Sequence, residues 1–70
     1  MEEIKIKTAT IDLGQFLKWG NLVSTGGEAK GVIKEARVKV NGEVETQRAK
    51  TLEPGDIVEF EGQKYKVVAS

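Results

Sequence analysis

The 70-residue chain has no cysteine, no histidine and a single proline. Without cysteine it can form neither disulfides nor thiolate metal sites, and without histidine it lacks the commonest general base and metal ligand. No apolar run reaches membrane-spanning length, and the N-terminus has no signal-peptide core. We therefore expect one cytoplasmic domain, residues 1–70, monomeric and without a cofactor or metal. A chain of this length buries only a modest core.

Catalytic residues are also missing from the sequence. Ser24 and Ser70 have no histidine to activate them, while Asp12 and Asp56 stand where a helix cap and a turn explain their presence. We therefore do not expect an enzyme.

Positive and negative charges are balanced overall but unevenly distributed. The chain carries eleven basic and eleven acidic residues, and residues 18–50 hold seven of the basic residues against four of the acidic ones. The segments before and after carry a net negative charge. Because salt screens each charge beyond about 8–10 Å, a local basic patch can bind phosphate on a neutral molecule.

Residues 25–42 predict a short helix that leads into a tight hairpin. Thr25 is a suitable N-cap, and Glu28 completes a capping box. Helical spacing of apolar residues then predicts a helix over about 26–36, with one basic flank. The apolar residues are Ala29, Val32, Ile33 and Ala36, and the basic ones are Lys30, Lys34 and Arg37. A strand at 38–40 and an Asn41-Gly42 turn follow.

The remaining pattern predicts an α+β fold, with two helices packed on a small, mostly antiparallel sheet. Residues 3–7 alternate as a strand does, and a helix over about 12–19 begins at a cap formed by Asp12 or Thr10. We expect a hairpin arm at 43–45, an irregular or extended connection at 46–51, and a type II turn at 53–56. Strands at 57–60 and 64–69, joined by a turn at Gly62-Gln63, complete the prediction.

The helix and hairpin together resemble a known RNA-binding family. The ordered set is Glu28-Ala29-Lys30, Ile33-Lys34, Arg37-Val38-Lys39-Val40-Asn41-Gly42 and Pro54-Gly55-Asp56. This set is similar to the S-four domain, which carries the alpha-L motif, and residues 11–60 look most like its short free-standing bacterial version. Gly26 stands where the family usually has arginine, and Ala36 stands where a helix-ending glycine is usual. The arginine often found at the start of the first helix is absent.

The resemblance implies an RNA-binding protein that contacts structured RNA, either ribosomal or transfer RNA, with the ribosome or ribosomal proteins as further partners. Lysine and arginine neutralise phosphates, and a glycine-containing helix start can approach one closely. If residues 46–51 are extended, Arg48 and Lys50 present their side chains together. The candidate RNA-binding residues are Lys18, Thr25, Gly26, Lys30, Lys34, Arg37, Lys39, Arg48 and Lys50.

Three alternatives stay open at this point. The zero net charge, the acidic C-terminal third and the missing arginines also fit a protein-interaction module that keeps the fold without binding RNA. Residues 24–27 fit a phosphate site or plain helix capping. Trp19 either stacks on an unpaired base or covers the core as a half-buried side chain, and we favour the second interpretation.

Overall fold

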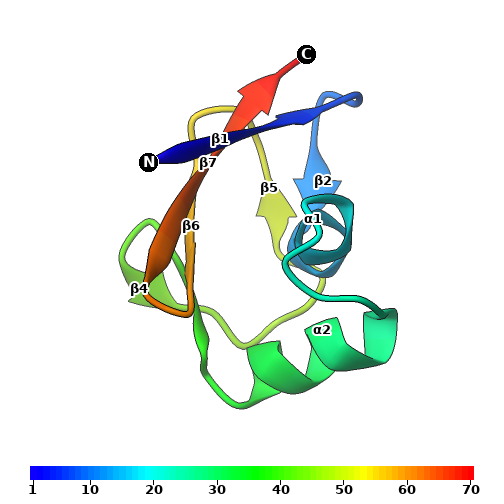
Figure 1. Ribbon diagram of the computed structural model, residues 1–70, viewed down its shortest axis with the longest axis vertical. Coiled ribbons are helices and arrows are strands. Elements are labelled where there is room, and N and C mark those ends of the chain that lie inside the picture. Colours follow the sequence, from blue (N-terminus) through cyan, green and yellow to red (C-terminus); the bar gives the residue numbers. More distant parts are fainter.

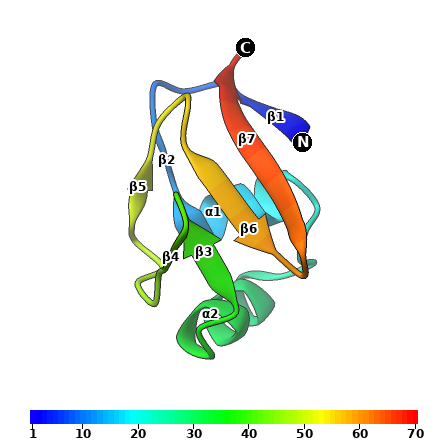
Figure 2. The same ribbon diagram turned by 90° about the vertical axis from the view of Figure 1, so that its left-hand side faces the viewer.

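The first and last strands of the chain pair with each other. The computed structural model describes residues 1–70 and places β1 (Glu2–Ile6) parallel to β7 (Gln63–Ala69). Antiparallel pairing then joins β7 to β6 (Ile57–Phe60), β6 to β3 (Val38–Val40), and β3 to β4 (Glu43–Val44). The sheet therefore has the order β1-β7-β6-β3-β4 and is mostly antiparallel, as predicted (Figure 2).

Two helices cover one face of this sheet. α1 (Leu13–Trp19) is seen nearly end-on in Figure 1, whereas α2 (Gly26–Lys34) runs across the bottom of the view, so their axes are far from parallel. A second, two-stranded sheet pairs β2 (Ile11–Asp12) with β5 (Thr51–Leu52) beside α1. Neither helix has the length and apolar character needed to cross a membrane.

One cluster of fifteen buried apolar residues lies between the sheet and the helices. The strands contribute alternate residues to it, and α1 contributes one apolar face. α2 contributes three residues of its predicted stripe, whereas the fourth, Ala36, is exposed. Leu52 is fully buried, and no polar or charged side chain is buried. The cluster consists of Ile4, Ile6, Leu13, Phe16, Leu17, Val23, Ala29, Val32, Ile33, Val38, Val40, Leu52, Val58, Phe60 and Val67.

The second helix is shorter at its end than the predicted range of 26–36. It ends at Lys34, and Ala36 has a φ of +62°, which is outside the helical region. At its start, the hydroxyl of Thr25 accepts a hydrogen bond from the Glu28 N–H at 3.1 Å. The Glu28 carboxylate in turn accepts from the Ser24 N–H at 2.8 Å, one residue before the cap.

The turns follow the glycine signals with one shift. Asn41 and Gly42 both have positive φ, and Gly55 has a φ of +102° in the turn at 53–56. The last hairpin turns at Glu61 and Gly62, one residue before the predicted Gly62-Gln63 turn, and Gln63 already belongs to β7.

Candidate nucleic-acid interface

α1, the start of α2 and the segment before β5 surround a hollow of about 320 Å³. Three of the predicted site residues, Lys18, Gly26 and Arg48, lie on its wall, although they come from three separate parts of the chain. We call it the α1–α2 hollow. The residues that line it are Asp12, Gly14, Gln15, Lys18, Gly26, Ala29, Arg48 and Ala49.

Backbone hydrogen bonds fix the 48–50 segment against α1. The Leu13 N–H donates to the Lys50 carbonyl at 2.8 Å, and the Gly14 N–H donates to the Arg48 carbonyl at 3.0 Å. Helix N-terminal amides have no partner within the helix, so the segment supplies partners for two of them. Asp12 is the N-cap, and its side chain accepts from the Gln15 N–H at 2.8 Å.

Arg48 and Lys50 would present their side chains together only if the 46–51 connection were extended throughout. It is not. The chain turns at Arg48 and Ala49, and the Lys50 N–H donates to the Gln47 carbonyl at 3.2 Å. The two-residue alternation of an extended strand therefore does not apply here. Arg48 lines the α1–α2 hollow, whereas the Lys50 side chain does not.

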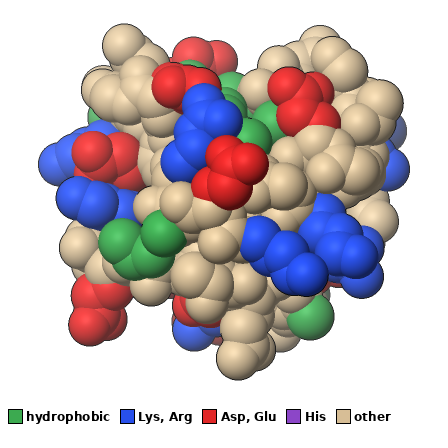
Figure 3. Space-filling model, turned by 90° about the horizontal axis from the view of Figure 1, so that it is seen from below, with side chains coloured by type: hydrophobic (Ala, Val, Ile, Leu, Met, Phe, Trp, Pro, Cys, Tyr) green, Lys and Arg blue, Asp and Glu red, His purple; other side chains and the backbone are tan.

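The basic flank of α2 lies next to this hollow. Gly26 is on the wall, and Lys30 lies one helical turn further along the same edge, followed by Lys34. Both lysines are exposed and form no ion pair. Figure 3, which views the α2 end of the molecule, shows one compact group of Lys and Arg side chains on the right and others interleaved with Asp and Glu. We call Lys18, Lys30, Lys34 and Arg48 the basic surface.

Arg37 does not belong with these lysines in the way that helical spacing indicated. The helix ends at Lys34, so the helical phase does not extend to Arg37. The Arg37 guanidinium instead pairs with the carboxylates of Glu61 and, at 3.5 Å, Glu35. Its Cζ atom also lies 5.8 Å from the centre of the Phe60 ring. Arg37 is thus an ion-paired residue that ties the end of α2 to the last hairpin.

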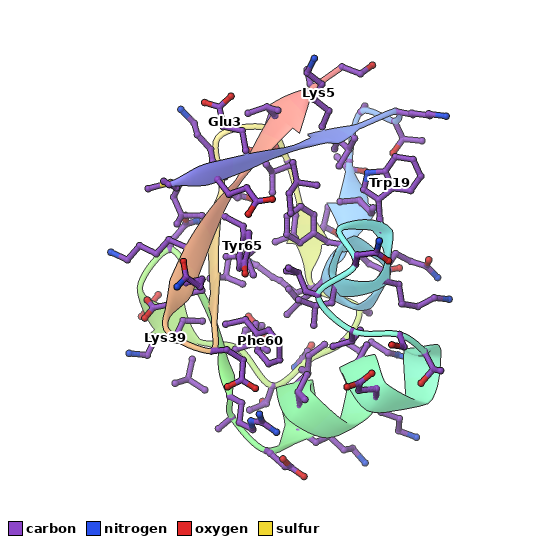
Figure 4. All side chains as sticks on the ribbon, in the orientation of Figure 1. Glu3, Lys5, Trp19, Lys39, Phe60 and Tyr65 are labelled. Atoms are coloured by element: carbon purple, nitrogen blue, oxygen red, sulfur yellow. The ribbon has the colours of Figure 1, made fainter.

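Lys39 lies on the opposite side of the sheet from the helices. Its neighbours Val38 and Val40 are buried, whereas Lys39 is exposed between Glu59 and Val44 on the adjacent strands. Figure 4 shows it at the lower left, far from α1. The structure therefore does not bring Lys39 to the α1–α2 hollow.

Thr25 is the N-cap of α2, and Gly26 is the first residue of the helix. The Thr25 hydroxyl is engaged with the Glu28 N–H, and the Glu28 carboxylate lies in the same first turn. A carboxylate at this point repels an anion, so the contacts at 24–27 fit the capping interpretation.

Trp19 is half exposed and is held against the first strand. Its indole N–H donates to the Lys5 carbonyl at 2.6 Å, and the Lys7 ammonium lies 5.5 Å from the ring centre. Figure 4 shows the ring beside β1 and β2. The side chain is 49% exposed and lines a small hollow with Ile6 and Ile11. These contacts fit the interpretation of Trp19 as a cover on the core.

Gly14, Gln15 and Ala49 also line the hollow and were not singled out from the sequence, and only Gly14 carried a signal. The signal was a glycine inside a predicted helix, where glycine is unfavourable without a packing or functional reason. It is also the one buried residue outside the apolar cluster.

Comparison with known proteins identifies the family of this chain. The family model described as "S4 domain" matches residues 4–68. "Probable ribosome maturation protein RlbA" from Bacillus subtilis is 46% identical over 59 residues, which cover 84% of this chain and 83% of that protein. "Putative RNA-binding protein YbcJ" from Escherichia coli is 37% identical over 59 residues, 84% of each chain.

Two solved structures have a similar fold. The solution structure of E. coli YbcJ, described as revealing an alpha-L motif involved in RNA binding, has a TM-score of 0.68 and 34% sequence identity over 97% of this chain and 85% of that one. The 30S ribosomal protein S4e from Thermoplasma acidophilum has a TM-score of 0.65 over 86% of this chain and 32% of that longer one. At 22% identity, that second likeness concerns the fold alone.

Proposed function

Because this chain belongs to the S4 domain family, we propose that it is a non-catalytic RNA-binding module that contacts structured RNA mainly through phosphates. The observation that carries the proposal is the convergence of Lys18 and Arg48 on one hollow, with the exposed Lys30 and Lys34 along its edge. The names of the RlbA and YbcJ relatives support RNA as the partner.

Structured ribosomal RNA is the target we propose first, and transfer RNA second. The B. subtilis relative is named a probable ribosome maturation protein, which supports a ribosomal context. We further propose that the protein acts as a monomer in the cytoplasm, where ribosomes are assembled.

The chemistry of the basic surface favours recognition of shape over recognition of sequence. Three of its four residues are lysines, which act as point charges toward phosphates, and one is an arginine with a forked guanidinium. Phosphate contacts position a protein on nucleic acid but carry no sequence information directly. Helical RNA is recognised mostly in this way.

The first test is the salt dependence of binding to purified ribosomal RNA. Four phosphate contacts at 0.7–0.9 each give a slope of log K against log salt of about −3. A flat salt dependence, or no binding at low salt, would contradict the proposal.

The second test reverses charges on two opposite surfaces. Lys30→Glu with Lys34→Glu changes the basic surface, and Lys64→Glu with Lys66→Glu makes the same change in net charge on exposed positions of β7. Losing two phosphate contacts and adding repulsion should weaken binding of the first variant by about a hundredfold or more. The β7 variant should retain most of its affinity.

The comparison between these variants separates the candidate functions. Equal losses in both would indicate attraction to net charge without a defined site. No loss in the α2 variant would remove the basic surface from consideration and favour the protein-interaction alternative.

A further inference from the structure

Gly14 is a buried glycine in the first turn of α1, next to a long basic side chain. A Cβ atom at position 14 would lie 2.5 Å from the Cγ atom of Arg48 and 3.1 Å from its Cδ atom. The first distance is too short for any real contact, so the absence of a side chain at Gly14 creates the space that the Arg48 stem occupies. By contrast, a Cβ atom at Gly31 on α2 would meet nothing within 4 Å.

Gly14 also holds the backbone of the same arginine. Its N–H donates to the Arg48 carbonyl at 3.0 Å, next to the Leu13 bond to Lys50. One residue therefore holds the main chain of Arg48 and leaves the space in which its side-chain stem lies. An arginine loses considerable rotamer freedom when it is ordered, so a stem already ordered in the free protein reduces that entropy cost on binding.

Arg48 is the arginine best suited to receive a phosphate. The chain has two arginines, and Arg37 is engaged with Glu35 and Glu61. Arg48 forms no ion pair, is exposed, and stands on the wall of the α1–α2 hollow with Lys18. A guanidinium can hold two phosphate oxygens at once, which an ammonium group cannot do in the same fixed geometry.

We propose that Gly14 is a positioning residue that seats the Arg48 stem and thereby aims its guanidinium at an RNA phosphate over the α1–α2 hollow. This inference rests on the proposed RNA-binding function. It assigns to the glycine a role in affinity that is separate from helix formation, because alanine at this position would favour the helix itself.

The test is Gly14→Ala, compared with Gly31→Ala as a matched glycine-to-alanine control. The new methyl group should force Arg48 into another rotamer and remove one charge-assisted contact, which weakens binding to purified ribosomal RNA by about tenfold. The salt slope should fall in magnitude by about 0.7–0.9. The Gly31→Ala variant should bind as the wild type does, and both variants should keep the wild-type circular dichroism spectrum.

A double-mutant comparison shows whether Gly14 acts through Arg48. Arg48→Ala should cause a similar loss, and Gly14→Ala combined with Arg48→Ala should bind no more weakly than Arg48→Ala alone. An additive loss in the double variant would overturn the inference, as would wild-type affinity in Gly14→Ala.

The order of the Arg48 side chain can be measured without RNA, by NMR nitrogen relaxation of the Arg48 Nε–Hε pair. We expect a more ordered signal in the wild type than in Gly14→Ala. Equal order in the two proteins overturns the inference even when RNA binds. A wild-type protein that does not bind RNA at low salt overturns the proposed function, together with the RNA role assigned to Gly14, whatever the Arg48 signal shows.

Discussion

Ala36 ends α2 in a conformation that usually requires glycine. Its N–H donates to the Ile33 carbonyl and the Arg37 N–H donates to the Val32 carbonyl, both at 3.1 Å. These two bonds form a Schellman motif, in which Ala36 takes the left-handed position with a φ of +62°. An L-residue with a Cβ atom is strained there, whereas glycine is not.

Ala36→Gly should therefore stabilise the protein. The relief of strain exceeds the extra entropy of glycine in the unfolded chain, and we expect a gain of about 0.5–1 kcal/mol in the free energy of unfolding. Urea denaturation measures this directly. Ala9→Gly, at an exposed position without positive φ, is the control and should give no gain. A lower denaturation midpoint for the position-36 variant would show that its backbone is not held in the left-handed region.

Trp19 provides a second test at the scale of one residue. Trp19→Phe keeps an aromatic ring but removes the N–H that donates to the Lys5 carbonyl. We expect a loss of about 0.5–1.5 kcal/mol in stability, the usual contribution of one hydrogen bond, with unchanged affinity for RNA. Base stacking contributes about 1–3 kcal/mol per base, so Trp19→Ala serves as the second variant, which removes any stacking surface. A drop in its affinity with the fold intact would restore the stacking interpretation.

At the scale of elements, Asn41 joins two turns that lie far apart in the sequence. Its side-chain amide donates to the Asp56 carboxylate at 3.1 Å, and its side-chain oxygen accepts from the Ile57 N–H at 2.9 Å. Asp56 also accepts from the Glu53 N–H at 2.9 Å. The Asn41-Gly42 and Pro54-Gly55-Asp56 signals are therefore two halves of one contact that holds β3 and β6 in register.

Asn41→Gly separates the two roles of this asparagine. Glycine tolerates the positive φ of +52°, so the turn is kept while the side-chain bonds are lost. Two hydrogen bonds, one of them to a carboxylate, predict a loss of about 1–3 kcal/mol in stability. Thermal denaturation measures the loss. The losses of stability caused by Asn41→Gly and by Asp56→Ala should not add in the double variant. Full additivity would mean that the hydrogen bond between the two side chains contributes nothing to stability.

The helices and hairpins were predictable because their signals are local. Capping residues, helical spacing and glycine turns each act over a few residues, as at Thr25 and Asn41. The pairing of β2 with β5 was missed because each strand has two residues, too few for a pattern. Arg37 was grouped with the wrong neighbours because the end of the helix depends on the conformation of Ala36.

The candidate site was predicted as a basic face of the second helix and the following hairpin, whereas the α1–α2 hollow was not predicted. Lys18, Gly26 and Arg48 were each identified from charge or position, but their convergence depends on hydrogen bonds between Leu13 or Gly14 and the 48–50 segment. Contacts over such a sequence separation leave no periodic signal in the chain. The same reason explains why the parallel pairing of β1 with β7 was not expected.

At the scale of the whole molecule, β1 contributes to the core although it lies before the region of strongest family resemblance. Ile4 and Ile6 are both buried and lie opposite Val67 and Ala69 of β7. Large-to-small changes at buried isoleucines cost about 2–5 kcal/mol each. A domain of this size has a total stability of about 4–10 kcal/mol.

Removal of residues 1–7 should therefore abolish cooperative folding. The measurement is thermal unfolding followed by circular dichroism, in which the truncated chain should show no transition. Glu3→Ala with Lys5→Ala, on the exposed face of the same strand, is the control and should melt close to the wild type. A cooperative transition in the truncated chain would show that the remaining elements form a sufficient core.

The position of β7 inside the sheet, between β1 and β6, has a consequence for how the protein is made. Synthesis proceeds from the N-terminus at about 5–20 residues per second, and β1 leaves the ribosome first. Its partner strand, β7, emerges after all the other strands of the sheet. Until β7 has emerged, β1 has no strand to pair with and β6 lacks one neighbour, so the sheet cannot close before that point.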